Sequence, residues 1–394
     1  MKGANYLEKL LDNQPVEWKK LGEIGIFQRG TSFQKKHFTD EGIPCIHYGQ
    51  IYTRYNLSAD KTISFLSPEF ASRARKAQSG DLIIATTSEN DEDVCKAIAW
   101  EGQEEVVVSN DACFYHHTMH PRYVAYFFQT EQFQKQKRSY ITGTKVRRVN
   151  ANDLARIEIP IPPLSVQSRI VEILDKFTSL EAELEAELEL RKKQYAYYRE
   201  QLLNFSYTPP SEFNVVYRKL GEVADYEQPT AYLVKDTKYK EDYPTPVLTA
   251  GKTFILGYTN ETEGIYEASK HPTIIFDDFT TALRWVDFDF KAKSSAMKMI
   301  TSKDENVCLL KYIYYWLCTV PSEVVVGDHK RQWISNYANK DFPLPPLSEQ
   351  ERIVEILDKF DTLTNSISEG LPLEIQLRRQ QYEYYREQLL DFRH

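Results

Sequence analysis

Cysteine is scarce in this 394-residue chain, and its spacing fits no known framework. The five cysteines are Cys45, Cys95, Cys113, Cys308 and Cys318, and no two of them form a Cys-x-x-Cys pair. An odd number without such spacing argues against a disulfide framework and against a structural zinc site. The sequence therefore predicts no bound metal and a reducing, cytoplasmic setting.

Long apolar runs are missing as well. No stretch approaches the roughly 20 apolar residues that a membrane-spanning helix needs, and no secretory signal precedes the first charged segment. We expect two principal domains and no membrane partner.

Catalytic motifs are also absent from the sequence. It contains no glycine-rich phosphate loop, Walker lysine, His-Glu-x-x-His or Gly-x-Ser-x-Gly. Pro162–Pro163 and Pro345–Pro346 lack the Asp or Asn and the aromatic residue that adenine methyltransferases place around a Pro-Pro pair. Asp277–Asp278 could indicate a metal site, but Ala85–Thr86 take that place in the first half, so we interpret these acids as structural. The chain is predicted not to be an enzyme on its own.

What the chain has instead is one long helical segment written twice. Residues 162–205 begin with Pro-Pro-Leu-Ser and end with Gln-Tyr-x-Tyr-Tyr-Arg-Glu-Gln-Leu-Leu, and residues 345–392 repeat this text. Pro163 and Pro346 lie 183 residues apart. Apolar residues at steps of three or four indicate a helix about 60 Å long. Ser165 and Ser348 are the expected N-caps.

Such a helix needs a partner along its length, and the second copy is the obvious one. We therefore predict an antiparallel coiled coil between the copies. The alternative is a pair of independent amphipathic helices in unrelated domains. Tandem Leu-Glu-Ala-Glu units begin at Leu180 and Leu184, whereas the second copy contains Gly370 and Pro372, which should break or kink its helix.

The segments before the two helices also resemble each other. Residues 18–23 and 217–222 both contain Lys-Leu-Gly-Glu, and short apolar strands follow in the same order. These predicted strands are residues 44–50, 81–86 and 106–109 in the first segment and residues 246–252, 273–278 and 296–300 in the second. Aromatic-rich helices are expected at 123–128 and 312–317, and we interpret their rings as core packing.

The predicted fold class is α+β with a pseudo-two-fold internal repeat. Two similar mixed α/β globular domains are joined and separated by the long antiparallel coiled coil. The expected parts are an N-terminal helix (1–14), a first globular domain (15–163), a first long helix (164–205), a connector (206–212), a second globular domain (213–346) and a second long helix (347–394).

The net charge of −8 does not exclude nucleic acid as a partner. The acids gather in the first long helix between Glu181 and Glu189, so charge is segregated along the chain. Each globular segment ends in a basic loop led by glycine, and Arg147–Arg148 correspond to Lys330–Arg331. Lysine and arginine can neutralise phosphates, and arginine, glutamine and asparagine can read base edges.

Two matching basic loops favour a DNA interface about as strongly as they favour solvated surface loops, which is the alternative interpretation. The candidate DNA-contacting residues are Gln50, Lys135, Lys137, Arg138, Thr144, Lys145, Arg147, Arg148, Asn150, Lys252, His329, Lys330, Arg331 and Gln332.

The duplicated helices resemble the conserved regions of type I restriction–modification specificity subunits. The Lys-Leu-Gly-Glu openings and the Gly-Asp-His-Lys-Arg-Gln-Trp-Ile-Ser stretch at 327–335 resemble the target recognition domains of that family. The resemblance covers nearly the whole chain. It does not identify base-contacting residues, because the recognition domains of the family vary.

This resemblance implies a DNA sequence-specificity subunit without an active site. Each recognition domain would read one half of a bipartite site in double-stranded DNA, and the coiled coil would set the spacer. Two methyltransferase subunits would dock on the chain, and restriction subunits would join through them, giving an adenine-specific methyltransferase and type I restriction endonuclease complex. S-adenosylmethionine would bind the methyltransferase subunits, and ATP and Mg²⁺ the restriction subunits.

Two other functions remain open from the sequence alone. One is a scaffold or oligomerisation subunit that makes no DNA contact and uses the helices as a stalk. The other is a fused methyltransferase or nuclease, which the missing motifs disfavour.

Overall fold

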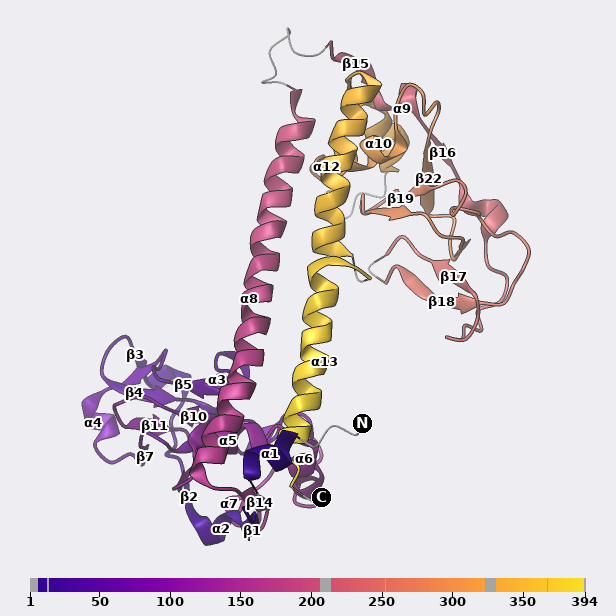
Figure 1. The fold of residues 1–394 in the computed structure, drawn as a ribbon. Helices are drawn as coiled ribbons and strands as arrows, with labels where there is room; N and C mark the ends of the chain where they lie inside the picture. The colour runs from indigo at the N-terminus through magenta and orange to yellow at the C-terminus, as the bar shows by residue number, and fades with distance from the viewer. Residues whose placement is uncertain are drawn as a thin grey trace. The chain divides into compact units, whose positions relative to one another are not determined.

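The computed structural model describes residues 6–12, 14–205, 214–251, 253–322, 331–366 and 368–392 (Figure 1). The chain divides into two compact units, defined here as unit 1 (Met1–Leu184 with Ile375–His394) and unit 2 (Glu185–Glu374). Each unit thus combines a globular body with parts of both helical repeats. Of the predicted leading helix, α1 (Tyr6–Leu11) is described. The predicted connector, 206–212, lies outside the described residues.

Unit 1 contains two five-stranded sheets, with strand orders β2-β12-β8-β10-β5 and β3-β6-β4-β11-β7. The strands of the first are β2 (Gly25–Arg29), β5 (Ser58–Ala59), β8 (Leu82–Ala85), β10 (Ala97–Trp100) and β12 (Ala112–His117), and those of the second are β3 (Phe38–Thr39), β4 (Ile43–Ile46), β6 (Phe65–Leu66), β7 (Lys76–Ala77) and β11 (Val106–Val108). Two strand pairs complete the unit: β1 (Glu17–Lys20) with β14 (Glu158–Ile161), and β9 (Thr87–Ser88) with β13 (Arg147–Arg148).

The central strand β8 is apolar throughout because both of its faces are covered. Leu82 and Ile84 point into a core shared with the helices, whereas Ile83 and Ala85 point into a second core between the two sheets. This alternation follows from the two-residue period of a strand. The predicted buried strand at 81–86 is therefore confirmed.

One face of the first sheet packs in a shared core with α5 (Pro121–Phe127), α6 (Glu131–Arg138), α2 (Leu21–Ile24) and α7 (Ala151–Leu154). The other helices of the body are α3 (Tyr48–Thr53), whose Ile51 packs in the core between the sheets, α4 (Pro68–Ala71), whose Ala71 packs against the second sheet, and η1 (Lys35–His37). Tyr123 and Tyr126 of α5 are fully buried. The interpretation of these aromatic residues as core packing is confirmed.

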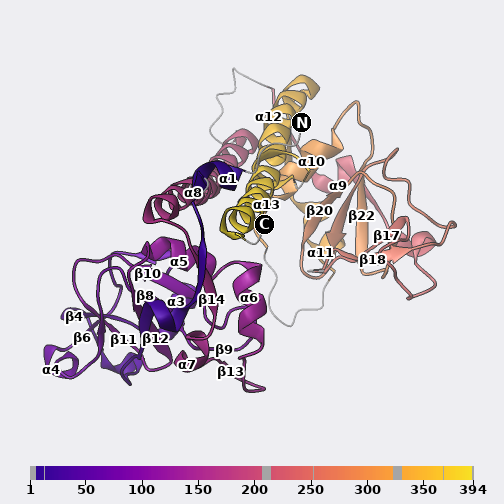
Figure 2. The same cartoon turned by 60° about the horizontal axis from the view of Figure 1, so that its bottom comes forward.

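Unit 2 repeats this plan with fewer strands (Figure 2). Its sheets have the orders β16-β22-β19-β20 and β18-β17-β21, and a separate pair joins β15 to β23. The strands are β15 (Val216–Lys219), β16 (Ala224–Glu227), β17 (Thr245–Leu248), β18 (Ile255–Thr259), β19 (Thr273–Asp277), β20 (Leu283–Val286), β21 (Lys291–Ala292), β22 (Met297–Ser302) and β23 (Asp341–Leu344). The helices of its body are α9 (Leu220–Val223), η3 (Pro229–Tyr232), α10 (Leu310–Leu317), α11 (Gln332–Ser335) and η4 (Tyr337–Asn339).

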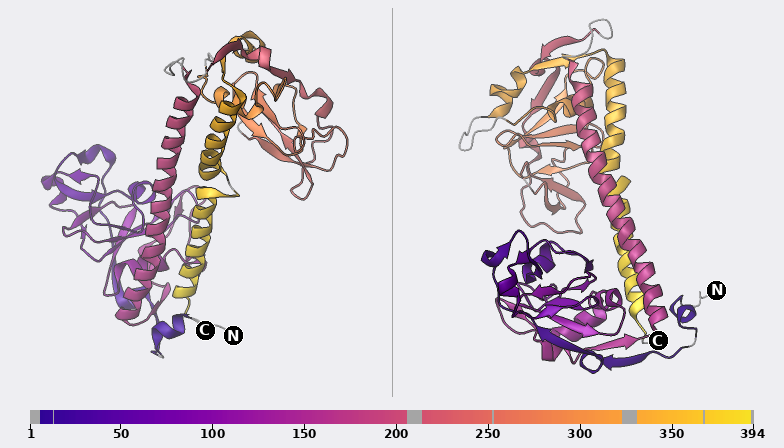
Figure 3. Two further views of the ribbon diagram at one scale, coloured as in Figure 1. Left: turned by 45° about the horizontal axis from the view of Figure 1, so that its top comes forward. Right: turned by 90° about the vertical axis from the view of Figure 1, so that its left-hand side faces the viewer.

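The two helical repeats form α8 (Leu164–Leu203), α12 (Leu347–Asn365) and α13 (Gly370–Leu390). In unit 1 the first part of α8 runs antiparallel to α13: Phe177 stacks on Tyr385 with ring centroids 5.3 Å apart, and Glu181 pairs with Arg379. In unit 2 the second part of α8 meets α12, where Tyr198 stacks on Phe360 at 5.6 Å. The predicted pairing of the helical copies is thus present within each unit (Figure 3).

Equivalent polar contacts attach each body to its helix. The Tyr126 hydroxyl donates to Asp175 of α8, and Tyr315 makes the matching bond to Asp358 of α12. Near each helix start, Gln167 and Gln350 are buried. Each amide accepts a backbone N–H from the loop before α5 or α10 and donates to a proline carbonyl. These bonds fix the body to the helix at the same point in both repeats.

Two local expectations need correction. Ser165 and Ser348 are not N-caps, because α8 and α12 begin one residue earlier, at Leu164 and Leu347, directly after the second proline. The strand predicted at 44–50 ends at Ile46, because the His47 side chain accepts the Gly49 N–H and starts α3.

The break predicted in the second helical copy is confirmed. α12 ends at Asn365 and α13 begins at Gly370, whose φ of 72° is in the left-handed region. A Cβ at this position would lie 2.5 Å from the Thr362 carbonyl oxygen, so glycine is required there.

None of the helices within the described residues is long and apolar enough to cross a membrane. The five cysteines are free thiols. Burial raises the pKa of Cys45 to about 12, which keeps the thiol protonated and suits a packing role.

Candidate nucleic-acid interface

The basic loop of unit 1 is a short hairpin beside the end of β8. Thr142 and Arg148 exchange two backbone hydrogen bonds of 2.9 Å, and Arg148 pairs with Thr87 between β13 and β9. Gly143 makes the turn with φ +87°, and a Cβ there would lie 2.2 Å from the Val146 carbonyl oxygen. The glycine that leads the loop therefore has a backbone role.

The two arginines of this loop have different surroundings. Arg147 is paired within the unit: its Nε lies 2.7 Å from the Asp91 carboxylate, and it also donates to the Gly143 carbonyl. Arg148 is exposed, and its guanidinium has no hydrogen-bond or ion-pair partner among the described residues. Arg147 therefore holds the hairpin, while Arg148 is available to a ligand.

A cavity of about 490 Å³ opens next to Arg148. Its lining includes Arg29, Thr86, Asn110, Asp111 and Cys113. Arg29 ends strand β2 and donates from Nε to the Asn110 carbonyl at 3.0 Å, which leaves its terminal nitrogens for other contacts. The cavity is therefore lined by two cations, Arg29 and Arg148, and by side chains that can donate or accept hydrogen bonds, such as Asn110 and Asp111.

Strand registers identify the same place in unit 2. Cys113 pairs with Ile84 between β12 and β8, as Lys298 pairs with Phe276 between β22 and β19. Two residues further along, the Thr86 carbonyl accepts the Val149 N–H at 3.1 Å, and the Asp278 carbonyl accepts the Gln332 N–H at 2.9 Å.

The residues before these two donors are Arg148 and Arg331. Sequence offset alone had matched them, and the matching bonds confirm this correspondence of Arg148 with Arg331. Lys330, the predicted counterpart of Arg147, lies outside the described residues. Asp277–Asp278 likewise occupy the place of Ala85–Thr86, as the sequence predicted.

Unit 2 fills the site with a buried ion pair. Lys298 Nζ lies 3.8 Å from Asp278 Oδ2, with both side chains at most 2% exposed, and 4.6 Å from the Tyr226 ring centroid. Burial lowers the pKa of Lys298 and the Asp278 charge opposes that shift. Asp278 Oδ1 also accepts the Trp333 N–H at 2.8 Å. Asp278 therefore holds the two residues that follow Arg331.

The acids of unit 2 have structural partners, as predicted. Asp277 accepts the N–H groups of Phe279 and Thr280. Among the described residues, no three His, Cys, Asp or Glu side chains converge as metal ligands.

Three predicted contact residues use their side chains in hydrogen bonds within unit 1. Lys137 is buried rather than at the surface, which corrects our expectation: Nζ donates to the carbonyls of Glu92 and Val94 at 3.0 and 2.9 Å. Burial also lowers its pKa. Gln50 accepts the His47 N–H and donates to Ser64. Asn150 caps α7 by accepting the Asp153 N–H at 3.0 Å.

The other candidates differ in exposure. Thr144 and Lys145 are exposed at the tip of the hairpin, and Arg138 is exposed on α6, 3.4 Å from Glu131. Arg331 is exposed, whereas Gln332 is buried. Lys252, His329 and Lys330 lie outside the described residues.

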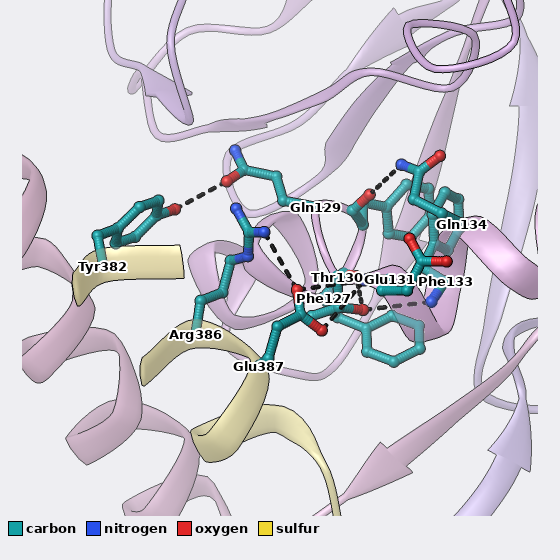
Figure 4. Close-up of polar contacts among 10 residues, drawn as sticks. Phe127, Gln129, Thr130, Glu131, Phe133, Gln134, Tyr382, Arg386 and Glu387 are labelled. Carbon is teal, nitrogen blue, oxygen red and sulfur yellow. Dashed lines mark hydrogen bonds and ion pairs between the residues drawn. The ribbon is translucent and has the colours of Figure 1, made fainter. Parts of the chain in front are cut away.

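Lys135 lines a different cleft, of about 250 Å³, between α6 and α13. Figure 4 shows how α13 meets this helix: the Tyr382 hydroxyl donates to Gln129 at 2.8 Å, and Glu387 accepts the Glu131 N–H at the start of α6. A carboxylate is favourable at a helix N-terminus. The cleft around Lys135 is lined by the acids Glu131, Glu387 and Asp391, whose negative charge disfavours DNA phosphates.

Sequence reasoning missed Arg29, Asn110 and Asp111. A usable signal was present, because Asn-Asp between two apolar runs indicates a turn, and a turn can present side chains at a sheet edge. Their closeness to Arg148 depends on strand order, which the sequence does not display.

Comparison with known proteins gives a consistent family. The model of the type I restriction modification DNA specificity domain matches residues 13–190 and 212–377. A putative type I restriction enzyme specificity subunit of Haemophilus influenzae is 33% identical over 405 residues, covering 98% of both chains. The EcoR124I/EcoR124II specificity subunit of Escherichia coli is 63% identical over 181 residues, a match that spans 44% of each chain.

Solved structures agree at the level of the fold. The type I restriction–modification S subunit from M. genitalium superposes with a TM-score of 0.57 at 13% identity, covering 96% of this chain and 97% of that one. The HsdS subunit from Thermoanaerobacter tengcongensis gives a TM-score of 0.51 at 16% identity over 96% and 97% of the two chains. With two matched domains, duplicated helices and whole-length relatives, the chain belongs to the type I restriction–modification DNA specificity subunits.

Proposed function

We propose that unit 1 and unit 2 each read one half of a bipartite site in double-stranded DNA, with Arg148 and Arg331 as the principal contacts. One observation supports this most directly. Both arginines are exposed. In each unit the N–H of the residue after the arginine donates to a carbonyl at the equivalent strand end, Thr86 in unit 1 and Asp278 in unit 2. Two readers built on one frame suit two short half-sites, as the geometry of dimeric DNA readers suits paired sites.

Arginine suits this role because its guanidinium binds a phosphate or donates twice to guanine O6 and N7. The exposed residues Thr144 and Lys145 extend the proposed surface in unit 1. Gln50, Lys137 and Asn150 are left out of it because their side chains serve the fold.

The test is to compare Arg148→Ala with Arg331→Ala in the full chain, produced together with its methyltransferase subunits. Methylome sequencing of the host first defines the wild-type site. Arg148→Ala is expected to weaken selection in one half-site and Arg331→Ala in the other, with a loss of about 1–3 kcal/mol for a base contact. Arg73→Ala, an exposed arginine outside the cavity, is the matched control. Unchanged selection in both variants would contradict the proposed contacts.

The proposal extends to the partner subunits. Leu190 and Tyr197 on α8 are 61% and 60% exposed, and their counterparts Leu377 and Tyr384 on α13 are 52% and 61% exposed. Residues seven apart lie on one face of a helix, and exposed apolar residues at matching places indicate protein contacts. Each pair is proposed to hold one methyltransferase subunit, with restriction subunits joining through those subunits.

The chemistry is proposed to belong to these partners. S-adenosylmethionine would bind the methyltransferase subunits, and ATP with Mg²⁺ the restriction subunits, in an adenine-specific complex of the cytoplasm. The chain itself would supply sequence selection and the spacing between half-sites.

A further inference from the structure

A turn between β11 and β12 places two polar side chains in the cavity of unit 1. The Ala112 N–H donates to the Ser109 carbonyl at 3.0 Å and closes the turn around Asn110 and Asp111. Both residues line the cavity together with Arg148. None of the candidate contacts predicted from the sequence lies on this turn.

The backbone of the turn is fixed by hydrogen bonds, whereas the Asp111 carboxylate acts on the described residues of the unit only through its charge, which opposes the lowering of the His47 pKa by burial. The Asn110 carbonyl accepts from Arg29 Nε, and the Asp111 carbonyl accepts from both the N–H and the hydroxyl of Thr86, at 2.9 and 3.0 Å. The Asn110 amide and the Asp111 carboxylate have no hydrogen-bond or ion-pair partner among the described residues, although both residues are partly buried. Polar side chains without hydrogen bonds on an already fixed backbone are suited to a ligand, since the backbone loses little freedom on binding.

The chemistry of these groups indicates a base edge rather than a phosphate. A carboxylate repels phosphate, but it accepts a hydrogen bond from the exocyclic amino group of cytosine. An asparagine amide offers one donor and one acceptor, which match N7 and the amino group of adenine. We infer that Asn110 and Asp111 are specificity-determining residues of unit 1 and that they read a base bearing an exocyclic amino group.

The second repeat supports this assignment by its difference. Met297 begins β22 as Ala112 begins β12, so Ser295 and Ala296 occupy the places of Asn110 and Asp111. The repeats thus share an exposed arginine and differ in the residues at the place of this turn. A common anchor with variable neighbours is what two readers of different half-sites require. The inference rests on the proposed reading of DNA by each unit.

The experiment uses the full chain purified with its methyltransferase subunits and a pool of randomised DNA duplexes. Bound duplexes are sequenced to define the wild-type site and its variants. Asn110→Ser with Asp111→Ala, which installs shorter side chains like those of unit 2, should lower discrimination roughly tenfold to a hundredfold at one or two positions of a single half-site. Asn56→Ser with Asp60→Ala changes two exposed residues of the same types outside the cavity and should leave selection unchanged.

Asp111→Asn keeps the shape of the side chain and decides the matter if the double variant fails to fold. Replacing one carboxylate oxygen with an amino group should weaken selection of the base that Asp111 reads. Undiminished discrimination at every position in the folded variants would overturn the inference while leaving the proposed function intact. If the wild-type complex selected no bipartite site, the proposed function itself would fail.

Discussion

Unit 1 keeps an open cavity at the place where unit 2 buries a lysine and an aspartate. The backbone around the two places is the same, since Val149 and Gln332 donate to equivalent strand ends. The side chains differ completely: Thr86 and Cys113 in unit 1, Asp278 and Lys298 in unit 2. The comparison shows that the repeated hydrogen-bond frame is independent of the side chains it carries, so one frame can present two chemically different surfaces.

The contacts between body and helix vary much less. Tyr126 and Tyr315 bond to Asp175 and Asp358 in the two units. The neighbouring cation is Arg122 in unit 1, which binds both Asp175 and Glu101. The same position in unit 2 is Lys311, 3.5 Å from Asp358. The attachment of the helices is therefore common to the repeats, and the strand ends carry the difference.

The largest effect is expected from breaking the ion pair of unit 2. Lys298→Met leaves the Asp278 carboxylate buried without its cation, which costs about 3–5 kcal/mol. Transplanting the unit 1 residues with Asp278→Thr and Lys298→Cys removes both charges and should recover most of that loss. Hydrogen exchange measured by mass spectrometry reports each unit separately. Equal destabilisation by the single and double changes would show that the charge pair is not responsible.

Acid is expected to affect the two units differently. Burial lowers the pKa of His117 to about 4, below its ordinary value of 6.5. Between these values the unfolded chain binds the proton more readily than the folded one, so stability is lost as the pH falls from 6.5 to 4, by about 3 kcal/mol.

Unit 2 has Ser302 in the place of His117, as the register with β2 and β16 shows. His117→Ser should therefore remove this part of the acid sensitivity of unit 1. The measurement is the free energy of unfolding against pH, taken as the difference between wild type and variant. A difference that stays constant from pH 7 to pH 4 would refute the role of His117.

A smaller and selective effect is expected on partner binding. Tyr197→Ala and Tyr384→Ala each remove one exposed aromatic residue from the proposed docking faces, with a loss of about 2 kcal/mol each. Each variant should retain one methyltransferase subunit, and the double variant should lose both, as measured by native mass spectrometry. Lys193→Ala, also exposed on α8, is the control. Two bound partners in the double variant would place docking elsewhere.

The smallest effect on base selection is expected from shortening the helix outside the bodies. Deleting Leu180–Glu183 removes one tandem unit, and Glu185 then takes the place of Glu181 opposite Arg379. The helix shortens by about 6 Å, against roughly 3.4 Å per base pair. The preferred spacer should therefore shorten by one or two base pairs, with both half-sites unchanged. Methylome sequencing of the host measures this, and full activity with unchanged spacing would contradict it.

Repetition made much of the fold predictable from the sequence. The offset of 183 residues matched Arg148 with Arg331, and the order of apolar segments matched Ala85–Thr86 with Asp277–Asp278. Gly370 marked the helix break because a left-handed φ favours glycine. These predictions depend on local chemistry and on comparing the halves, both of which a sequence displays.

The candidate site was less predictable because tertiary partners decide which charges stay free. Arg147 is paired with Asp91, and Lys137 is buried against the carbonyls of Glu92 and Val94. Those partners lie far away in the sequence, so nothing near Arg147 distinguishes it from Arg148. The turn at Asn110 lies at the site because of the order of the strands in the sheet, which the sequence does not display.

The division of unit 1 between two distant chain segments has a consequence for its biogenesis. Residues 375–392 are synthesised after all of unit 2, yet they supply Leu389 and Leu390 to the core of unit 1 and a carboxylate to the start of α6. While unit 2 is being translated, the nascent body of unit 1 has an uncovered apolar face along α8. The core of the unit that leaves the ribosome first is therefore completed last, and a chain that ends before residue 375 is expected to leave that core open.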